Sequence, residues 1–123
     1  MTPPPFDFEP LTPTAFLARA AVVFGDRLAV VDDAARFTYD QFHARCLRLA
    51  GALRALGIAP GERVAVVAPN THFLLAAHYA VPLAGAVLVA LNTRITADDI
   101  AYILEHAGVR VLIYDDAYGA TAL

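Results

Sequence analysis

An uncharged, mostly apolar run from Phe73 to Leu91 constrains the fold of this chain more than any other feature. The run has 19 residues, and a helix of that length can cross a membrane. Pro82 and Gly85 interrupt it, however, and its last segment, residues 86–91, has the small and β-branched side chains of a buried parallel strand. We therefore predict a buried helix that kinks or stops at Pro82, a turn at Gly85 and a buried strand, with no transmembrane span.

Further apolar segments extend this unit into a parallel sheet. Residues 63–68 form a nearly continuous apolar strand, and Asn70 is the expected N-cap of the helix that follows. Residues 97–107 have helical periodicity after Thr96, and residues 109–114 form the last strand. The order strand, helix, strand, helix, strand predicts an α/β fold in which a parallel βαβ sheet is covered by helices.

The segment before this unit predicts a helix and a hairpin. Thr12 marks the start of a helix over residues 13–24, with Gly25 as its left-handed C-cap. Short extended segments at residues 27–31 and 36–38 are expected to pair as a hairpin.

A second helix follows the hairpin. Residues 38–41 have the form of a capping box, so this helix begins after Thr38. Gly57 ends the helix, and Pro60 prevents its continuation. The apolar residues that recur along it at helical spacing, and that are expected to face the core, are Phe42, Cys46, Leu49, Leu53 and Leu56.

Composition limits the classes of protein that fit. The chain has 123 residues, the size of one domain, and its net charge of −3 gives no support for binding nucleic acid or an anionic membrane. Its apolar fraction of 59% and mean hydropathy of +0.55 are high for a small domain, so either a membrane or further protein must cover apolar surface. The single cysteine, Cys46, excludes an internal disulfide and is typical of a reducing compartment, so we expect a cytoplasmic location.

The chain is expected to consist of an N-terminal arm and one domain. Residues 1–11 are expected to form a Pro-rich arm without the features of a secretory signal. Residues 12–123 are expected to form the domain.

Polar residues follow the predicted strands, where ligands of open parallel sheets usually bind. Arg94 could hold an anion there, or it could pair with Asp98 or Asp99 at the next helix start, which is the role we expect. The aspartates are expected to be turn and loop residues rather than metal ligands. The polar residues beyond the strands are Asp32, Asp33, Asn70, Thr71, His72, Asn92, Thr93, Arg94, Asp115 and Asp116.

Other chemistry-bearing residues have structural explanations. No glycine pair has G-x-G spacing, and without lysine neither a phosphate-binding loop nor a receiver domain with its usual lysine fits. We expect His72 to be a partly exposed helix-start residue, His78 to be buried and bonded to the backbone, and His43 to be solvated. His106 suits the last turn of its helix, and Cys46 suits the core. The histidines lack metal-ligand spacing, so we assign no catalytic, cofactor-binding or metal residue.

Several short motifs occur in a specific order over residues 11–115. They are Phe24-Gly25-Asp26-Arg27, Phe37-Thr38-Tyr39-Asp40-Gln41-Phe42, Ala50-Gly51-Ala52-Leu53, Leu56-Gly57-Ile58, Gly61-Glu62-Arg63-Val64-Ala65-Val66, Ala68-Pro69-Asn70, Pro82-Leu83-Ala84-Gly85-Ala86-Val87-Leu88-Val89-Ala90-Leu91-Asn92 and Asn92-Thr93-Arg94. Together they resemble the N-terminal portion of an acyl-CoA synthetase of the adenylate-forming, AMP-binding superfamily.

The resemblance implies a ligase that activates a carboxylic acid, here expected to be a fatty acid, and transfers it to coenzyme A. It implies that ATP, Mg²⁺ and coenzyme A serve the full-length enzyme, and that the phosphate loop and catalytic lysine lie downstream of the matched region. We therefore expect this chain alone to be inactive and to bind none of these groups. The resemblance also implies that residues 12–123 form a truncated domain, and that the remainder of the same polypeptide covers its apolar surface. The alternatives are a stand-alone α/β domain that pairs through its apolar surface, for example as a homodimer, and a small membrane-anchored protein.

Overall fold

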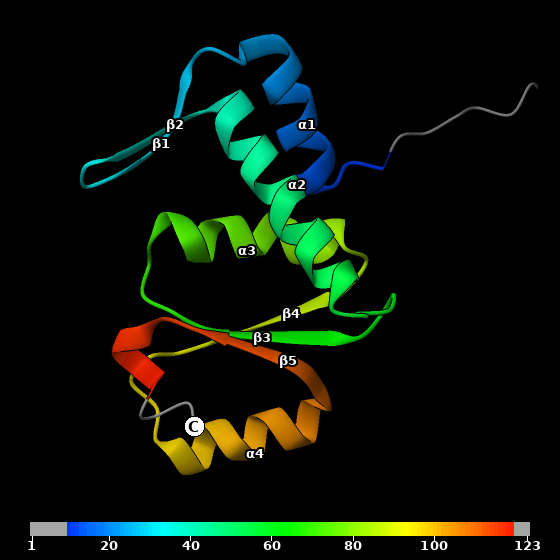
Figure 1. Ribbon diagram of the computed structural model, residues 1–123, viewed down its shortest axis with the longest axis vertical. Coiled ribbons are helices and arrows are strands. Elements are labelled where there is room, and N and C mark those ends of the chain that lie inside the picture. The colour runs from blue at the N-terminus through cyan, green and yellow to red at the C-terminus, as the bar shows by residue number, and fades with distance from the viewer. Residues whose placement is uncertain (1–9, 120–123) are drawn as a thin grey trace, which may run out of the picture.

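The computed structural model describes residues 10–119, and within them two sheets and four α-helices are present (Figure 1). The α/β fold class is confirmed, while residues 1–9 of the expected arm lie outside the described part. In chain order the elements are α1 (Pro13–Phe24), β1 (Leu28–Asp32), β2 (Ala35–Thr38), α2 (Tyr39–Ala55), β3 (Arg63–Val67), α3 (His72–Leu83), β4 (Val87–Leu91), α4 (Ala97–Ala107), β5 (Val109–Tyr114) and a short 3₁₀ helix, η1 (Asp116–Tyr118).

The parallel sheet has β3 at its centre, in the order β4-β3-β5. Ala65 on β3 pairs with Val89 on β4 and with Leu112 on β5, and both pairings are parallel. Residues 64–67 are at most 1% exposed, whereas β4 and β5 are only partly buried. The predicted βαβ order is therefore confirmed, with β3 buried on both faces.

Helices cover both faces of this sheet. Successive side chains of a strand point to opposite faces, so Val64 and Val66 pack on the α3 side. Ala65 and Val67 pack instead with Ile100 of α4. Figure 1 shows α3 against one face, with α1 and α2 stacked beyond it, and α4 on the opposite face, where Tyr118 of η1 also packs.

The apolar run forms α3 and β4, as predicted. α3 spans 12 residues and ends one residue after Pro82, so the expected stop at the proline is confirmed. Gly85 then turns the chain into β4 with a φ of 85°, a conformation that glycine adopts without steric cost. Within residues 10–119, no helix has the length and apolar character needed to span a membrane.

The predicted hairpin and capping box are also confirmed. β1 and β2 pair antiparallel, and Asp33 occupies the turn with a φ of 49°. At the start of α2, Thr38 Oγ1 accepts the Gln41 N–H at 3.3 Å, and Gln41 Oε1 accepts the Thr38 N–H at 2.9 Å. We expected Asp32 and Asp33 to lie at a strand end of the parallel sheet. This expectation was wrong, because the hairpin forms a sheet of its own.

The apolar stripe of α2 differs from the prediction at its last position. Phe42, Cys46 and Leu53 are buried, but Leu56 is 69% exposed. The helix ends one residue before Leu56, and Ile58 folds back in its place, with its N–H donating to the Leu53 carbonyl at 3.2 Å. The expectation for Leu56 was wrong because the helical periodicity stops before it reaches this residue.

Gly25 serves close packing rather than a left-handed cap. Its φ and ψ are −44° and −46°, so the predicted conformation was wrong. A Cβ at this position would lie 2.5 Å from Asp40 Oδ2 and 2.8 Å from the Ala21 carbonyl oxygen. Glycine is therefore needed because this position is enclosed by the backbone of α1 and by the Asp40 side chain at the start of α2.

Two glycine substitutions test this explanation. We expect Gly25→Ala to destabilise the fold by about 1–3 kcal/mol, because the added methyl overlaps a backbone oxygen that cannot move freely. Gly51→Ala is the matched control: it lies inside α2 with no atom within 4 Å of an added Cβ, and it should stabilise by about 0.5–1 kcal/mol. Urea unfolding measures both, and a Gly25→Ala variant as stable as the wild type would contradict the close approach.

Candidate functional site

The loops after the three parallel strands lie along one edge of the sheet. Val67 pairs with Leu91 and with Tyr114 at the last register positions, and the Asp115 N–H donates to the Val67 carbonyl at 2.9 Å. The expected grouping of these three strand ends is confirmed. Asp115 already has a structural role, since its Oδ1 accepts the Ala117 N–H at 3.0 Å at the start of η1.

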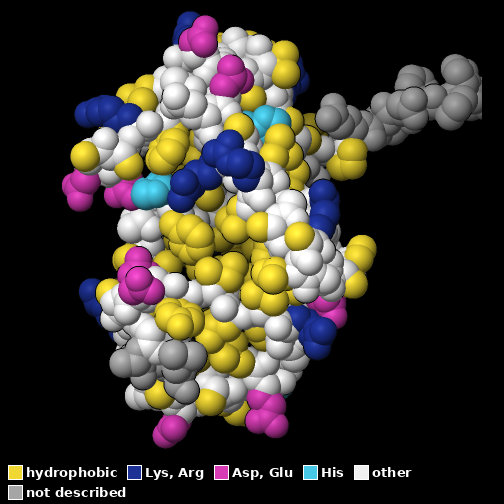
Figure 2. Space-filling view, in the orientation of Figure 1, with side chains coloured by type: hydrophobic (Ala, Val, Ile, Leu, Met, Phe, Trp, Pro, Cys, Tyr) yellow, Lys and Arg dark blue, Asp and Glu magenta, His cyan; other side chains and the backbone are white. Residues whose placement is uncertain are grey.

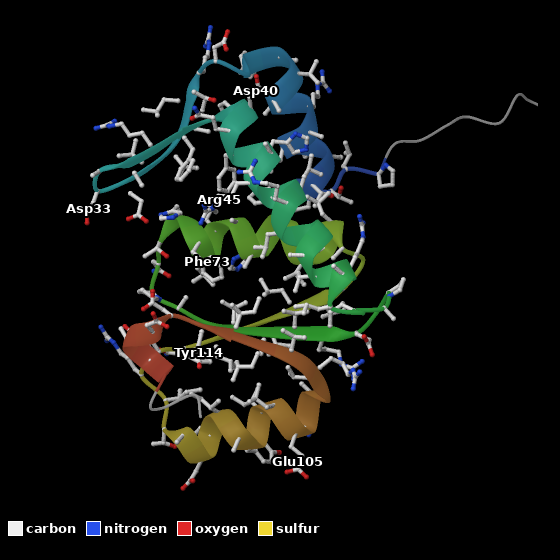
Figure 3. The ribbon with its side chains drawn as sticks, viewed as in Figure 1. Asp33, Asp40, Arg45, Phe73, Glu105 and Tyr114 are labelled. Atoms are coloured by element: carbon white, nitrogen blue, oxygen red, sulfur yellow. The ribbon has the colours of Figure 1, made fainter. Side chains whose placement is uncertain are left out.

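A second cluster joins the hairpin to α3. Oδ2 of Asp32, at the end of β1, accepts the His72 backbone N–H at 2.8 Å and the hydrogen on His72 Nδ1 at 2.7 Å. The His72 ring lies 5.2 Å from the Phe37 ring, and the Arg45 guanidinium lies 5.5 Å from the centre of the same phenyl ring. Figure 3 labels Arg45 on α2 and Asp33 at the tip of the hairpin. Four elements, β1, β2, α2 and α3, therefore meet at one cluster.

Asp32 supplies the N-terminal cap that α3 lacks. Asn70 was predicted to be this cap, but Thr71 occupies the position, and its side chain makes no capping hydrogen bond. A carboxylate here satisfies a free N–H and interacts favourably with the helix dipole. Two hydrogen bonds hold the pKa of Asp32 below its usual value. The bond from the His72 backbone N–H has the larger effect, and the bond from the His72 ring has the smaller one. The two side chains are each 26% exposed.

An open groove of about 590 Å³ lies beside this contact, between β1 and α3. Its walls are mostly apolar, and its polar residues come from the end of β1 and from the start and middle of α3. The lining residues are Pro13, Val30, Val31, Asp32, Asn70, Thr71, His72, Leu74, Leu75, His78 and Tyr79.

Arg94 does not have the structural role that we expected. Within residues 10–119 it forms no ion pair with Asp98 or Asp99. Asp99 instead closes a capping box with Thr96, which lowers the pKa of its carboxyl group. The Arg94 side chain is exposed, and its backbone N–H donates to Asn92 Oδ1 at 2.9 Å.

The remaining histidines and the cysteine agree with most of the predictions. Nδ1 of His78 bonds to the Leu74 carbonyl at 2.8 Å as expected, but His78 is exposed rather than buried. His106 lies in the last turn of α4, stacked on Tyr102 at 5.6 Å. Cys46 is fully buried, and burial raises its pKa to about 11, which confirms a packing role. Within residues 10–119, no group of three or more His, Cys, Asp or Glu side chains could hold a metal ion.

Two arginines close helix ends, and sequence reasoning missed both. Arg63 of β3 donates from Nε to the Ala107 carbonyl at 2.6 Å and from Nη2 to the Gly108 carbonyl at 2.9 Å, at the C-terminus of α4. Arg54 of α2 donates to the carbonyl of Leu83, the last residue of α3. Because the contacts to Ala107 and Leu83 span 44 and 29 residues of chain, no local motif marks them.

Substitutions at Asp32 test the cap. Asp32→Ala removes the acceptor for both His72 N–H groups, so we expect a clearly lower midpoint of urea unfolding. Asp32→Asn keeps an acceptor oxygen but loses the charge, and should lie between Asp32→Ala and the wild type. Asp33→Asn is the matched control, because asparagine tolerates the positive φ at the turn, and it should leave the midpoint unchanged. Equal midpoints for all three variants would contradict the capping role.

The pH dependence of this contribution has a definite sign. The folded pKa of Asp32 is below the unfolded value of 3.8, so its ionised carboxylate stabilises the fold above that value, and the contribution is lost as the pH falls through the folded pKa. We expect the difference in stability between the wild type and Asp32→Asn to be largest near neutral pH and to shrink below about pH 4. A difference that stays constant between neutral and acidic pH would rule out an ionised cap.

The sequence of this chain is similar to a known enzyme family and to several of its members. The sequence profile of the family described as AMP-binding enzyme matches residues 17–123. The chain is 44% identical over 115 residues to 2-methylpropanoate–CoA ligase CCL4 of Humulus lupulus, covering 94% of this chain and 21% of the relative. It is 45% identical over 113 residues to a peroxisomal benzoate–CoA ligase of Arabidopsis thaliana, covering 92% and 20%. The chain therefore spans about a fifth of the length of these curated relatives.

Solved structures give the same result. A Mycobacterium tuberculosis fatty acyl CoA synthetase superposes with a TM-score of 0.84 at 35% identity, over 88% of this chain and 22% of that protein. A benzoate CoA ligase from Burkholderia xenovorans LB400 superposes with a TM-score of 0.85 at 34% identity, over 89% and 22%. The N-terminal domain of FACL13 from M. tuberculosis also matches, with a TM-score of 0.84 at 35% identity, over 88% and 28%. The resemblance to the N-terminal portion of acyl-CoA synthetases is confirmed, and the chain belongs to the AMP-binding enzyme family.

Proposed function

We propose that this chain is part of a CoA ligase that joins a carboxylic acid to coenzyme A in two steps. The carboxylate first attacks ATP, which gives an acyl-adenylate and releases pyrophosphate. The sulfur of coenzyme A then attacks the acyl carbon, and AMP leaves. The observation that carries this proposal is the family match over residues 17–123, together with relatives that are named as CoA ligases.

A fatty acid is the substrate class that we propose, because one structural neighbour is named as a fatty acyl CoA synthetase. Other relatives are named for 2-methylpropanoate and benzoate, so these three acids define the range to be tested. We also propose a cytoplasmic location for the enzyme, although several relatives are named as peroxisomal.

Three of the described aspartates already have structural roles, which bears on where ATP and Mg²⁺ bind. Carboxylates that could serve as ligands already close helix ends: Asp32 caps α3, Asp99 caps α4 and Asp115 caps η1. We therefore propose that ATP, Mg²⁺ and coenzyme A bind residues outside this chain. The residues of this chain would then serve as structural scaffold for that site.

The rest of the polypeptide is proposed to cover apolar surface that this chain leaves exposed. Figure 2 shows apolar side chains gathered across the middle of one face, at the level of α3 and the sheet. Within residues 10–119, β4 and β5 each pair on one edge only. Residues 12–123 would then be one part of a larger domain, and a homodimer would use whatever surface remains. The exposed large apolar residues outside the groove between β1 and α3 include Phe16, Val22, Val23 and Val87.

Activity assays test this proposal. A polypeptide that continues the reading frame beyond Leu123 should release pyrophosphate and form an acyl-CoA with ATP, coenzyme A and a suitable acid. The 123-residue chain should release none above the blank without acid. The acids are a long-chain fatty acid, benzoate and 2-methylpropanoate, with the acyl-CoA product identified by mass spectrometry. A longer polypeptide that activates none of them would overturn the ligase assignment. An active 123-residue chain would overturn the proposal that ATP, Mg²⁺ and coenzyme A bind outside this chain.

A further inference from the structure

We propose that the groove between β1 and α3 binds an apolar molecule carrying one hydroxyl group, which donates a hydrogen bond to Nε2 of His72. This inference does not depend on the proposed ligase activity. It rests on the hydrogen bond between Nδ1 of His72 and Asp32 and on the polar groups that line the groove.

The contact with Asp32 fixes where His72 carries its proton. An ionised carboxylate can only accept, so the hydrogen of the 2.7 Å contact belongs to Nδ1 of His72. In the neutral imidazole, Nε2 is then a bare acceptor, and among the described residues it has no hydrogen-bond partner. A carboxylate that holds a histidine in one tautomer in this way also fixes the plane of the ring.

In two other polar groups of the groove, the hydrogen-bond donor is already used in a bond within the protein. His78 Nδ1 donates to the Leu74 carbonyl at 2.8 Å, so its Nε2 is also an acceptor when the ring is neutral. The Thr71 hydroxyl donates to the Pro69 carbonyl at 3.4 Å. With the carboxylate of Asp32 beside them, these groups offer a ligand lone pairs.

The same arrangement selects against anions. A carboxylate ligand would lie near the negative charge of Asp32 and would find its hydrogen-bond partners mainly in Asn70 and Tyr79, the lining residues that keep a donor. A hydroxyl group instead supplies the single donor that Nε2 of His72 lacks.

The walls of the groove suit an apolar body. Val31 and Leu75 are 53% and 41% exposed although they face this groove, and Val30, Leu74 and Tyr79 complete the apolar lining. The volume of about 590 Å³ lies within the range of about 300–1,000 Å³ that is usual for small-molecule sites. A phenol or a short-chain alcohol therefore fits both the shape and the polarity.

Three probes of similar shape test whether the groove prefers a hydroxyl group over no polar group and over a carboxylate. We would titrate a polypeptide that continues the reading frame beyond Leu123 with p-cresol, toluene and p-toluate, and follow the methyl groups of Val31 and Leu75 by NMR. We expect p-cresol to bind about five- to tenfold more tightly than toluene, the factor expected for one hydrogen bond, and p-toluate to bind most weakly. Equal affinities for p-cresol and toluene, or tightest binding by p-toluate, would overturn the proposal while leaving the ligase assignment untouched.

Two variants and one direct measurement assign the acceptor. His72→Phe keeps a ring against Phe37 and the backbone N–H to Asp32, and it should abolish the preference for p-cresol over toluene. His78→Gln is the matched control in the same groove and should retain the preference. In the unsubstituted chain, long-range ¹H–¹⁵N spectra should show Nε2 of His72 unprotonated and shifted on addition of p-cresol. A protonated Nε2, or one that p-cresol does not shift, would overturn the proposal whether or not His72→Phe folds.

Discussion

The start of α3 depends on a hydrogen-bond acceptor that its own sequence does not provide. This helix packs against the central sheet, and an unsatisfied N–H in such a place costs a free energy comparable to a lost hydrogen bond. Asp32 supplies the acceptor from a hairpin 40 residues earlier in the chain. The same contact also helps to hold the hairpin, because a two-stranded sheet is only marginally stable on its own. Packing of Val30 and Phe37 against the main core cluster adds to it. One carboxylate oxygen therefore stabilises two elements that neither sheet pairing nor chain connectivity would hold together.

Charged side chains close helix ends elsewhere in the molecule, and their signs follow the helix dipole. Acidic groups lie at the N-termini of α3 and α4, while Arg54 and Arg63 lie at the C-termini of α3 and α4. Arginine suits this role because its guanidinium carries several donors in a fixed plane, so Arg63 reaches two carbonyl groups at once. These charged side chains thus hold helices in position around β3.

Local chemistry was sufficient to predict most elements of the fold. The capping box at Thr38, the stop at Pro82 and the buried character of β3 all depend on neighbours within one or two turns of chain, and all are confirmed. The errors concern residues whose partners are distant or whose element ends unexpectedly. Gly25 was assigned to a left-handed cap, but its role depends on Asp40 in another helix. Likewise the cap of α3 could not be located from residues 69–72, because its acceptor belongs to β1.

The strand order β4-β3-β5 has a consequence for the way this sheet assembles during synthesis. β3 is the central strand, yet it is the first of the three to be made. Its neighbours join from opposite sides, each after a helical crossover, so residues 64–67 stay without a strand partner until β4 emerges, and without the second until β5 emerges. Chains grow at about 5–20 residues per second, which is slow compared with helix formation. The most buried strand of the sheet is therefore the one that waits longest for its strand partners on the ribosome. α1 and α2 are both completed before it, and they share a core cluster with its residue Val64, so they can help to cover it.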